Sequence, residues 1–545
     1  LLRSGRWYDR AWVGDLLSMT PASHAVIGTG SFPKDDGGIV NWNWTTGSKI
    51  SPSMQSLASF QSGWAFGVMK QSGTPTLAES IRKAYPRSTV IAGSGSHFHA
   101  AGPMGGPAAS WIFSYQRQKG VWAPYTVGQR AVPTRLLQDP ALRTRLLSSN
   151  GNTVPLLYEP LPLGQEDSLV SDFAVKALQN YRPRAIMINL PEPDTIGHWS
   201  QNWRAEEAVL YRAFDRDLGN IIEAYKRAGI FKQTLFAITA DHGMAQSRSR
   251  VFDLGALENV LNAQHDPALL SNGVGTDTMM ALWMNDASRR LRVAKAIYAA
   301  HLDNVSAVFA LEQTGHSYRY RMVGCEQCSP ALVAAYRYLM ETEAGPTGEG
   351  IAILFRENAR RSGLKAMTGR HGGADWASQQ VTLLLSGPGV RHGVSHHPAR
   401  LVDLTPTIER FMGITPDARD GVVLADAFTT PSRTDVATQR RSDVVLGAYD
   451  NALRDRAASD TALEAAGRLP NSTPADELGL APNAPSWQVF LVESIDSMTS
   501  LLGAWEPAFL LAIPVVAWAL WRRRKHRPGS REQKPADARL PTGSK

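Results

Sequence analysis

The feature that most constrains this chain is a short apolar run that ends in an adjacent aspartate and histidine. Residues 235–239 are mostly apolar or β-branched, and Asp241 and His242 follow them in a small-residue turn. The pattern predicts a buried parallel strand. Ligands of open α/β sheets collect at the carboxyl ends of the strands. A carboxylate and an imidazole at such a point suit zinc or a similar cation, although an ordinary loop with a capping Asp would give the same short pattern.

The same combination recurs at two further places. A second apolar run, residues 184–190, is followed closely by an Asp and a His, and a third His lies in a glycine-rich turn before the apolar run 381–385. Three such loops in one chain are difficult to explain as helix caps. We therefore expect a metal-binding group with these ligands: Asp194, His198, Asp241, His242 and His371.

The connection between the first two loops indicates the fold class. Residues 201–228 carry an apolar stripe at helical spacing and join the strand at 184–190 to the strand at 235–239. A strand–helix–strand unit of this kind is expected to place both strands parallel in one sheet. The sequence therefore predicts an α/β fold with side chains of the site at the strand ends.

Together, three segments resemble the alkaline phosphatase superfamily, and the branch they resemble most is type I phosphodiesterase/nucleotide pyrophosphatase. They are Glu192-Pro193-Asp194-x3-His198, Thr239-Ala240-Asp241-His242-Gly243-Met244 and Gly369-x-His371-Gly372. The resemblance extends over about residues 15–425 and implies an α/β sandwich with a mostly parallel central sheet. It also implies two divalent metal ions, with zinc favoured. One ion would take Asp194, His198 and His371, and the other Asp241, His242, the oxygen of Thr20 and an upstream Asp.

Thr20 is the nucleophile that the resemblance implies. It begins a Thr-x3-His pattern that leads through an apolar run to Thr29-Gly30, similar to the family's nucleophile segment. The N-terminus of a helix favours a phosphate group, because its dipole is positive there and its first amides are free. The resemblance implies attack of Thr20 on phosphorus and a phospho-threonine intermediate. The alternative is that Thr20 only caps the helix.

The start of the chain departs from the family pattern. In the resembling family a strand that ends in a metal-ligand Asp precedes the nucleophile by several tens of residues, whereas nineteen residues precede Thr20. The first residue is not Met, and no signal peptide is visible. We therefore expect a truncated or processed N-terminus and one missing metal ligand.

Two further segments bear on substrate binding. Asn41 lies where the family has an amide that contacts a phosphoryl oxygen, with Asn43 as the reserve. Trp42 could stack on a base or aryl group, or belong to the core. His97 and His99 stand where a monoester-cleaving branch carries Lys-x-Arg, and neutral imidazoles supply less positive charge than Lys and Arg. This difference favours diester substrates.

The charge of the chain argues against nucleic-acid binding. The net charge is +8, but the residues after position 521 include nine Lys/Arg and two Asp/Glu, which leaves about +1 for the rest. A nearly neutral body lacks the basic surface that nucleic-acid binding requires. We expect a small phosphate ester or nucleotide as substrate instead.

The only cysteines, Cys325 and Cys328, form a lone C-x-x-C pair. A four-cysteine zinc site would need a second pair, so a short local disulfide in an oxidising compartment is the favoured interpretation. A thioredoxin-like redox function is the alternative, and it is disfavoured.

The C-terminal end predicts a membrane anchor. Fifteen residues without a charge, 507–521, are followed by a basic cluster, and tryptophans flank the run. A buried core helix or a cleaved sorting tail is the alternative. We expect the catalytic part outside the cytoplasm, in a periplasm or at a cell surface. The predicted organisation is 1–250 and 366–425 for the catalytic domain, 251–365 for an inserted cap-like region, 426–497 for a linker, 499–521 for a transmembrane helix and 522–545 for a cytoplasmic tail.

The resemblance thus predicts a metal-dependent phosphoric ester hydrolase of the phosphodiesterase/nucleotide pyrophosphatase type. A phosphomonoesterase of the same superfamily is the nearest alternative. A membrane-tethered, non-catalytic binding module is another, because one expected ligand is missing.

Overall fold

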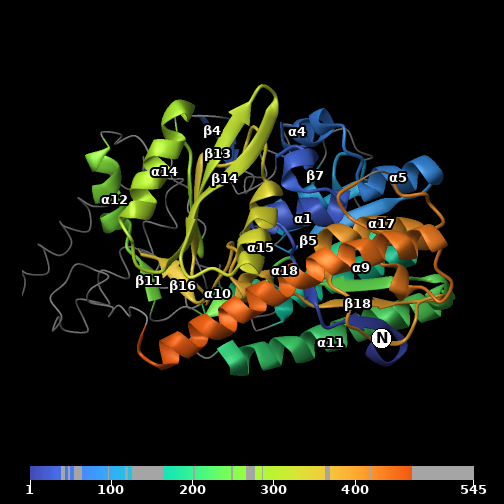
Figure 1. Ribbon diagram of the computed structural model, residues 1–545. Coiled ribbons are helices and arrows are strands. Elements are labelled where there is room, and N and C mark those ends of the chain that lie inside the picture. The colour runs from blue at the N-terminus through green and yellow to red at the C-terminus, as the bar shows by residue number, and fades with distance from the viewer. Residues whose placement is uncertain are drawn as a thin grey trace, which may run out of the picture. The chain divides into compact units, whose positions relative to one another are not determined.

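The computed structural model describes residues 1–38, 43–46, 49–53, 64–95, 97–116, 121–125, 164–199, 203–246, 250–264, 277–284, 286–362, 369–417 and 419–468. All of them belong to one compact unit, Leu1–Pro485. Within it, helices pack on three four-stranded sheets, and Figure 1 shows their arrangement.

The first sheet has the order β7-β6-β5-β8. Its central strand β5 (Val90–Ser94) pairs in parallel with β6 (Trp111–Gln116) and with β8 (Ala185–Asn189). The outer strand β7 (Val121–Tyr125) pairs antiparallel with β6. β8 lies at the opposite edge, so its other side has no strand partner among the described residues.

Helices cover both faces of this sheet. Val90 and Ala92 of β5 pack with one set of helices, whereas Ile91, between them, packs with Phe173 on the other face. The alternation follows from the two-residue period of a strand. The first face is covered by α1 (Thr20–Thr29), α4 (Trp64–Ser72), α5 (Leu77–Ala84) and α6 (Phe98–Gly105), and the second by α9 (Gln165–Tyr181).

The second sheet has the order β19-β1-β18-β9. β9 (Phe236–Thr239) and β1 (Arg6–Tyr8) both pair antiparallel with β18 (Leu383–Ser386), and β19 (Gly393–Ser395) pairs in parallel with β1. Tyr8, Leu383 and Leu385 pack with α1 and with α17 (Leu404–Phe411).

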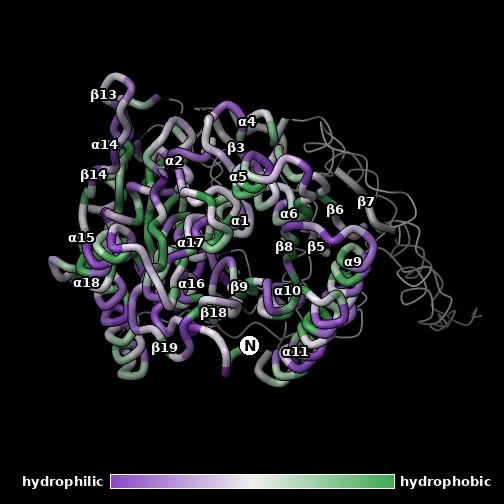
Figure 2. The backbone as a smooth tube through the Cα atoms, turned by 90° about the vertical axis from the view of Figure 1, so that its right-hand side faces the viewer, coloured by the Kyte–Doolittle hydropathy of each residue, from purple (hydrophilic) through white to green (hydrophobic). Residues whose placement is uncertain are grey.

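The prediction of one mostly parallel central sheet is wrong for the described residues. β8 and β9 exist where predicted, and α11 (Trp203–Arg227) connects them, but they are edge strands of two separate sheets. β9 is antiparallel to its neighbour because its hydrogen-bond partner is β18 and not β8. Both strands and α11 line a cavity of about 2490 Å³. Figure 2 shows β8 and β9 apart, with α11 beside them. The predicted burial of both strands is also incomplete, because their residues are mainly half-buried.

The third sheet is antiparallel and lies within residues 251–365. Its order is β12 (Met279–Leu282), β15 (Ile351–Phe355), β13 (Val305–Thr314) and β14 (Ser317–Cys325). α15 (Pro330–Glu341) covers one face, and α12 (Leu254–Ala263) and α14 (Arg290–Ala299) cover the other. The region is therefore a regular layered unit, and its role as a cap remains a prediction.

The remaining elements are short, apart from one long helix. The helices are α2 (Pro33–Asp36), α10 (Glu192–Trp199), α16 (Trp376–Gln379) and α18 (Arg433–Ala465). Four strand pairs complete the described strands: β2 (Ala11–Trp12) with β20 (Ala399–Arg400), β3 (Asn43–Thr46) with β4 (Lys49–Ser53), β10 (Ala245–Gln246) with β17 (Gly369–Arg370), and β11 (Arg250–Phe252) with β16 (Ala359–Arg361).

The predicted membrane anchor and basic tail, residues 499–545, lie outside the described residues. Among the helices that the structure does describe, none combines the length and the apolar composition that a membrane span requires.

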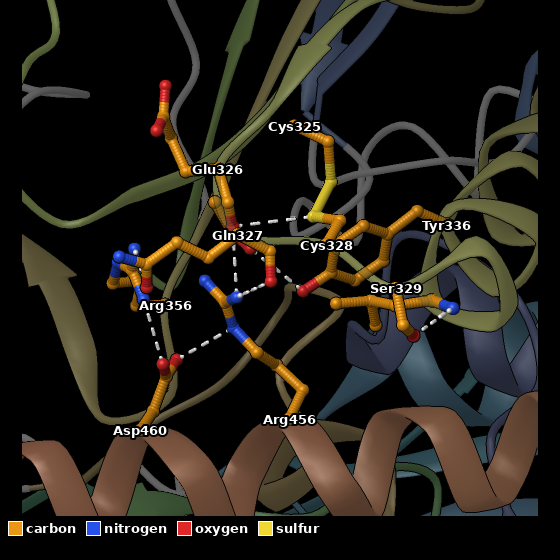
Figure 3. The surroundings of a disulfide bond; sticks show 11 residues. Cys325, Glu326, Gln327, Cys328, Ser329, Tyr336, Arg356, Arg456 and Asp460 are labelled. Atoms are coloured by element: carbon orange, nitrogen blue, oxygen red, sulfur yellow. Dashed lines mark hydrogen bonds and ion pairs between the residues drawn. A yellow bond between two sulfur atoms is a disulfide. The ribbon is translucent and has the colours of Figure 1, made fainter.

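The predicted local disulfide is present between Cys325 and Cys328. It closes the turn between β14 and α15, and α18 contacts this turn (Figure 3). Arg456 of α18 donates from Nη1 to the carbonyl oxygens of Glu326 (3.0 Å) and Gln327 (3.3 Å). The disulfide therefore stabilises a turn whose carbonyl groups bind a long C-terminal helix.

We predict that replacing both cysteines by serine lowers the free energy of unfolding by about 2 kcal/mol, because a four-residue loop regains its entropy in the unfolded chain. Chemical denaturation followed by circular dichroism measures the change. A reducing agent should destabilise the wild-type protein by the same amount and leave the double variant unaffected. Equal stability of wild type and variant under oxidising conditions would contradict the prediction.

Candidate metal centre and active site

Asp194, His198 and His371 converge although they come from distant parts of the chain. Asp194 and His198 lie four residues apart on α10, so they share one helix face. His371 directly follows β17. Asp194 Oδ1 lies 3.3 Å from His198 Nε2 and 3.4 Å from His371 Nε2, and the two Nε2 atoms are 3.1 Å apart. Of the described residues, these three form the one group of His, Cys, Asp and Glu whose ligand atoms are close enough to hold a metal ion.

Backbone carbonyl groups determine which imidazole nitrogen faces this group. Nδ1 of His198 lies 2.9 Å from the Gly369 oxygen, and Nδ1 of His371 lies 3.1 Å from the Ser18 oxygen. A carbonyl oxygen only accepts hydrogen bonds, so each Nδ1 carries the hydrogen and donates it. In the neutral ring Nε2 then carries a lone pair, and both lone pairs point into the group.

This arrangement fits a bound cation. Two lone pairs 3.1 Å apart repel each other unless a proton or a metal ion lies between them. Asp194 Oδ1 is buried and accepts no hydrogen bond of good geometry from the described residues. Ligand atoms that each lie about 2.0–2.1 Å from a tetrahedral zinc are about 3.3 Å apart, which is close to the three separations observed.

A second group of predicted residues lies beside the first. Asp241 and His242 follow β9, and Asp241 Oδ2 is 3.4 Å from His242 Nε2. Thr20 Oγ1 is 3.2 Å from the same Nε2. The His242 ring stacks on the His371 ring with centroids 3.6 Å apart, and His242 Nε2 is 3.9 Å from Asp194 Oδ1. The structure thus brings both predicted ligand sets together in one continuous site.

Thr20 is the first residue of α1 and is buried. The residue at the cap position is Met19, and no side chain makes a capping hydrogen bond there. The interpretation of Thr20 as a simple helix cap is therefore wrong. Its hydroxyl can donate to His242 Nε2, because Nδ1 of His242 donates to the Gly243 oxygen at 3.0 Å and leaves Nε2 as an acceptor.

Burial and the neighbouring charges set the ionisation of the site. Burial would raise the pKa of Asp194, but the neighbouring imidazoles, His198 first, hold that pKa well below its usual value. Burial lowers the pKa of His242 to about 4, so this ring is neutral at pH 7. Burial opposes protonation of His371 as well, yet the Asp194 carboxylate raises the pKa of His371. A proton on His371 and a metal ion would therefore compete for the position between the rings.

The predicted substrate-binding residues divide into two sets. His97 and His99 are described: His97 Nε2 lies 3.8 Å from Asp194 Oδ2, and the two rings are 4.9 Å apart. Burial lowers the pKa of His99 well below its usual value. Asn41 and Trp42 lie outside the described residues, so their assignments remain predictions.

One residue of the site received no role from the sequence. His24 of α1 is buried, and its Nδ1 lies 2.8 Å from the Thr20 oxygen and 3.4 Å from Asp241 Oδ2. The available signal was its spacing, four residues after Thr20, which places both residues on one face of a helix. The sequence does not reveal the contact with Asp241, because that residue is more than two hundred positions away.

Comparisons with known proteins identify the family and the fold. A family model described as type I phosphodiesterase / nucleotide pyrophosphatase matches residues 1–323. The chain is similar in structure to the wild-type alkaline phosphatase PafA, with 16% sequence identity, a TM-score of 0.60, and coverage of 78% of this chain and 93% of that chain. It is also similar to human ectonucleotide pyrophosphatase / phosphodiesterase 5, with 15% identity, a TM-score of 0.50, and coverage of 79% and 93%. No curated protein sequence matches. At these identities the two structures show the shared fold alone.

We predict that zinc affinity depends on the proton of His371. Zinc must displace this proton, and the pKa of His371 is raised by Asp194. As the pH is lowered through the raised pKa of His371, the apparent affinity for zinc should therefore fall about tenfold per pH unit for each displaced proton. The fall should begin above the usual histidine pKa of about 6.5. Competition with a chromophoric chelator between pH 5.5 and 8 measures the dependence.

His396→Ala is a suitable control for this titration, because His396 is exposed and pairs with Asp9 at the surface. This variant should show the wild-type pH dependence. A zinc affinity that stays constant across the pH range would show that no histidine proton competes with the metal.

Proposed function

We propose that this chain, which belongs to the type I phosphodiesterase / nucleotide pyrophosphatase family, cleaves phosphodiesters through Thr20. The family confirms the prediction from the motifs and makes the protein a phosphoric ester hydrolase. The observation that carries the proposal is the position of the Thr20 hydroxyl. It lies 3.2 Å from His242 Nε2, at the N-terminus of α1 and beside two groups of potential metal ligands. A hydroxyl oxygen at this position could attack the phosphorus atom of a phosphoryl group bound in the site.

The residues suited to hold metal ions form two sets. Asp194, His198 and His371 would hold one ion, and Asp241, His242 and Thr20 would hold the other, together with the upstream Asp that the family resemblance implies. Bound divalent cations, with zinc favoured, would lower the pKa of the hydroxyl and neutralise charge on the phosphoryl oxygens. Asp and His without Cys suit a hydrolytic zinc site better than a structural one.

The proposed reaction has two displacements at phosphorus. The Thr20 oxygen attacks phosphorus, the bond from phosphorus to the ester oxygen breaks, and the alcohol or nucleotide leaves with a proton. Water then attacks the phospho-threonine, and the bond from phosphorus to the Thr20 oxygen breaks to regenerate the hydroxyl. The positive end of the α1 dipole favours the phosphate in both steps. By sequence position, Asn41 would contact a non-bridging oxygen.

His97 and His99 support a preference for diesters. A monoester carries one more negative charge than a diester and gains more from fixed cations. The lowered pKa of His99 keeps this ring neutral. Burial opposes a charge on His97, but the Asp194 carboxylate raises the pKa of His97 and at the same time offsets the positive charge that this ring would carry. A phosphomonoesterase is the alternative reading of the same ligands.

We also propose that the protein works outside the cytoplasm, tethered through its C-terminal segment. The Cys325–Cys328 disulfide supports an oxidising compartment. The uncharged run at 507–521 and the basic cluster after it support a membrane anchor with a cytoplasmic tail.

Substrate preference and the role of Thr20 are tested together. We predict that the zinc-loaded full-length protein hydrolyses bis-p-nitrophenyl phosphate faster than p-nitrophenyl phosphate, measured as kcat/KM from released nitrophenolate. Thr20→Ala should lower kcat by at least about a thousandfold, because the attacking oxygen is lost. Thr20→Ser keeps the hydroxyl and should retain most of the activity.

The matched control is Ser23→Ala, which removes another buried hydroxyl from the same helix. Its activity should stay within about threefold of wild type. A monoester preference would overturn the diester assignment, and wild-type turnover by Thr20→Ala would exclude Thr20 as the nucleophile. Zinc binding without turnover of either substrate would favour the non-catalytic binding module.

A further inference from the structure

We propose that His24 is a positioning residue that holds the Asp241 carboxylate against the N-terminal turn of α1. The inference rests on the proposed function, because it gives the Thr20 and Asp241 side chains their relative placement. His24 Nδ1 lies 2.8 Å from the Thr20 carbonyl oxygen and 3.4 Å from Asp241 Oδ2. One ring nitrogen thus faces both the main chain of the proposed nucleophile and the carboxylate of the proposed ligand.

The chemistry of the carbonyl group determines the state of His24 Nδ1. The Thr20 oxygen only accepts, so Nδ1 carries a hydrogen and donates it. Asp241 Oδ2 lies 3.4 Å from the same nitrogen but does not share this hydrogen bond, so the contact is an attraction between the N–H dipole and the carboxylate. His24 therefore fixes an N–H group beside the carboxylate, and this role does not require the ring to be charged.

Asp241 needs such a support because its other close partner is a proposed ligand too. Asp241 Oδ2 lies 3.4 Å from His242 Nε2, and a cation between these two atoms would occupy that side of the carboxylate. His24 approaches the same oxygen from α1. Ligating carboxylates are commonly oriented by hydrogen bonds from groups that do not touch the metal.

The helix that carries His24 is closely packed, so it cannot shift to compensate for a lost contact. Ala22, Ala25 and Val26 of α1 have no exposed surface. At Gly28 the helix lies so close to α6 that a side-chain carbon there would be 2.5 Å from the Met104 carbonyl oxygen. The donor at position 24 is therefore held at a fixed distance from Asp241, which is the condition for a precise site.

Two substitutions of His24 distinguish a role of its Nδ1–H group from a role in packing alone. In asparagine the amide nitrogen is two bonds from Cβ, as Nδ1 is in histidine, whereas in glutamine it is three bonds away, as Nε2 is. His24→Asn therefore preserves the donor and His24→Gln displaces it. Intrinsic helix propensity favours His24→Gln instead, because glutamine forms helices more readily than asparagine. A purely structural role of His24 would thus favour the glutamine variant.

The experiment compares wild type, His24→Asn and His24→Gln in the full-length protein. We expect His24→Gln to lower kcat for bis-p-nitrophenyl phosphate by about 10- to 100-fold with KM within about twofold, and to weaken binding of Zn²⁺ alone by a similar factor. His24→Asn should recover both quantities to within about threefold of wild type. Thermal unfolding of both apo variants shows whether each is folded.

Equal losses in the two variants, or a smaller loss in His24→Gln, would overturn the proposal. So would losses in kcat and zinc affinity that vanish once each variant is corrected for its folded fraction. Failure of the proposed function would appear elsewhere, as undiminished turnover in Thr20→Ala. In that case the Zn²⁺ titrations of the two His24 variants would still test whether His24 positions Asp241.

Discussion

The site depends on hydrogen bonds from imidazole Nδ1 atoms to backbone carbonyl groups. His198, His242 and His371 each direct Nδ1 at a carbonyl oxygen, at 2.9, 3.0 and 3.1 Å. These bonds fix the tautomer and leave every Nε2 as an acceptor that faces the site. The resulting cluster brings lone pairs and carboxylates close together at a largely buried place, where they repel one another. A cation at its centre would remove this repulsion, so the arrangement of the donor atoms favours metal binding.

The fold supplies these carbonyl groups from segments far apart in the chain. The Gly369 oxygen beside His198 belongs to β17, and the Ser18 oxygen beside His371 belongs to the segment before α1. His198 and His371 are thus oriented by segments that carry other parts of the site, whereas His242 is oriented by the carbonyl group of the next residue, Gly243. The same interdependence applies to α1, which carries both Thr20 and His24 and packs tightly on α6. Any shift of one segment would disturb several of the proposed ligands together.

The sequence located the side chains of the site but not the arrangement of the sheets. The proximity of Asp194, His198, Asp241, His242 and His371 could be predicted, because strand ends followed by Asp and His form a local pattern, and their role as metal ligands remains a prediction. The separation of β8 from β9 could not be predicted, because the choice of β18 as the partner of β9 is made between segments more than a hundred residues apart. The role of His24 was hidden for the same reason. Its helical spacing to Thr20 is visible in the sequence, but its approach to Asp241 depends on tertiary packing.

The most direct test of the central claim is anomalous diffraction at the zinc edge from crystals of the zinc-loaded protein. The predicted result is a peak about 2.0–2.1 Å from Nε2 of His198, Nε2 of His371 and a carboxylate oxygen of Asp194. Coordination through Nδ1 of either histidine, or zinc bound elsewhere with these three side chains unchanged, would contradict it. In that case the convergence of the three residues would be a feature of packing and not of metal binding.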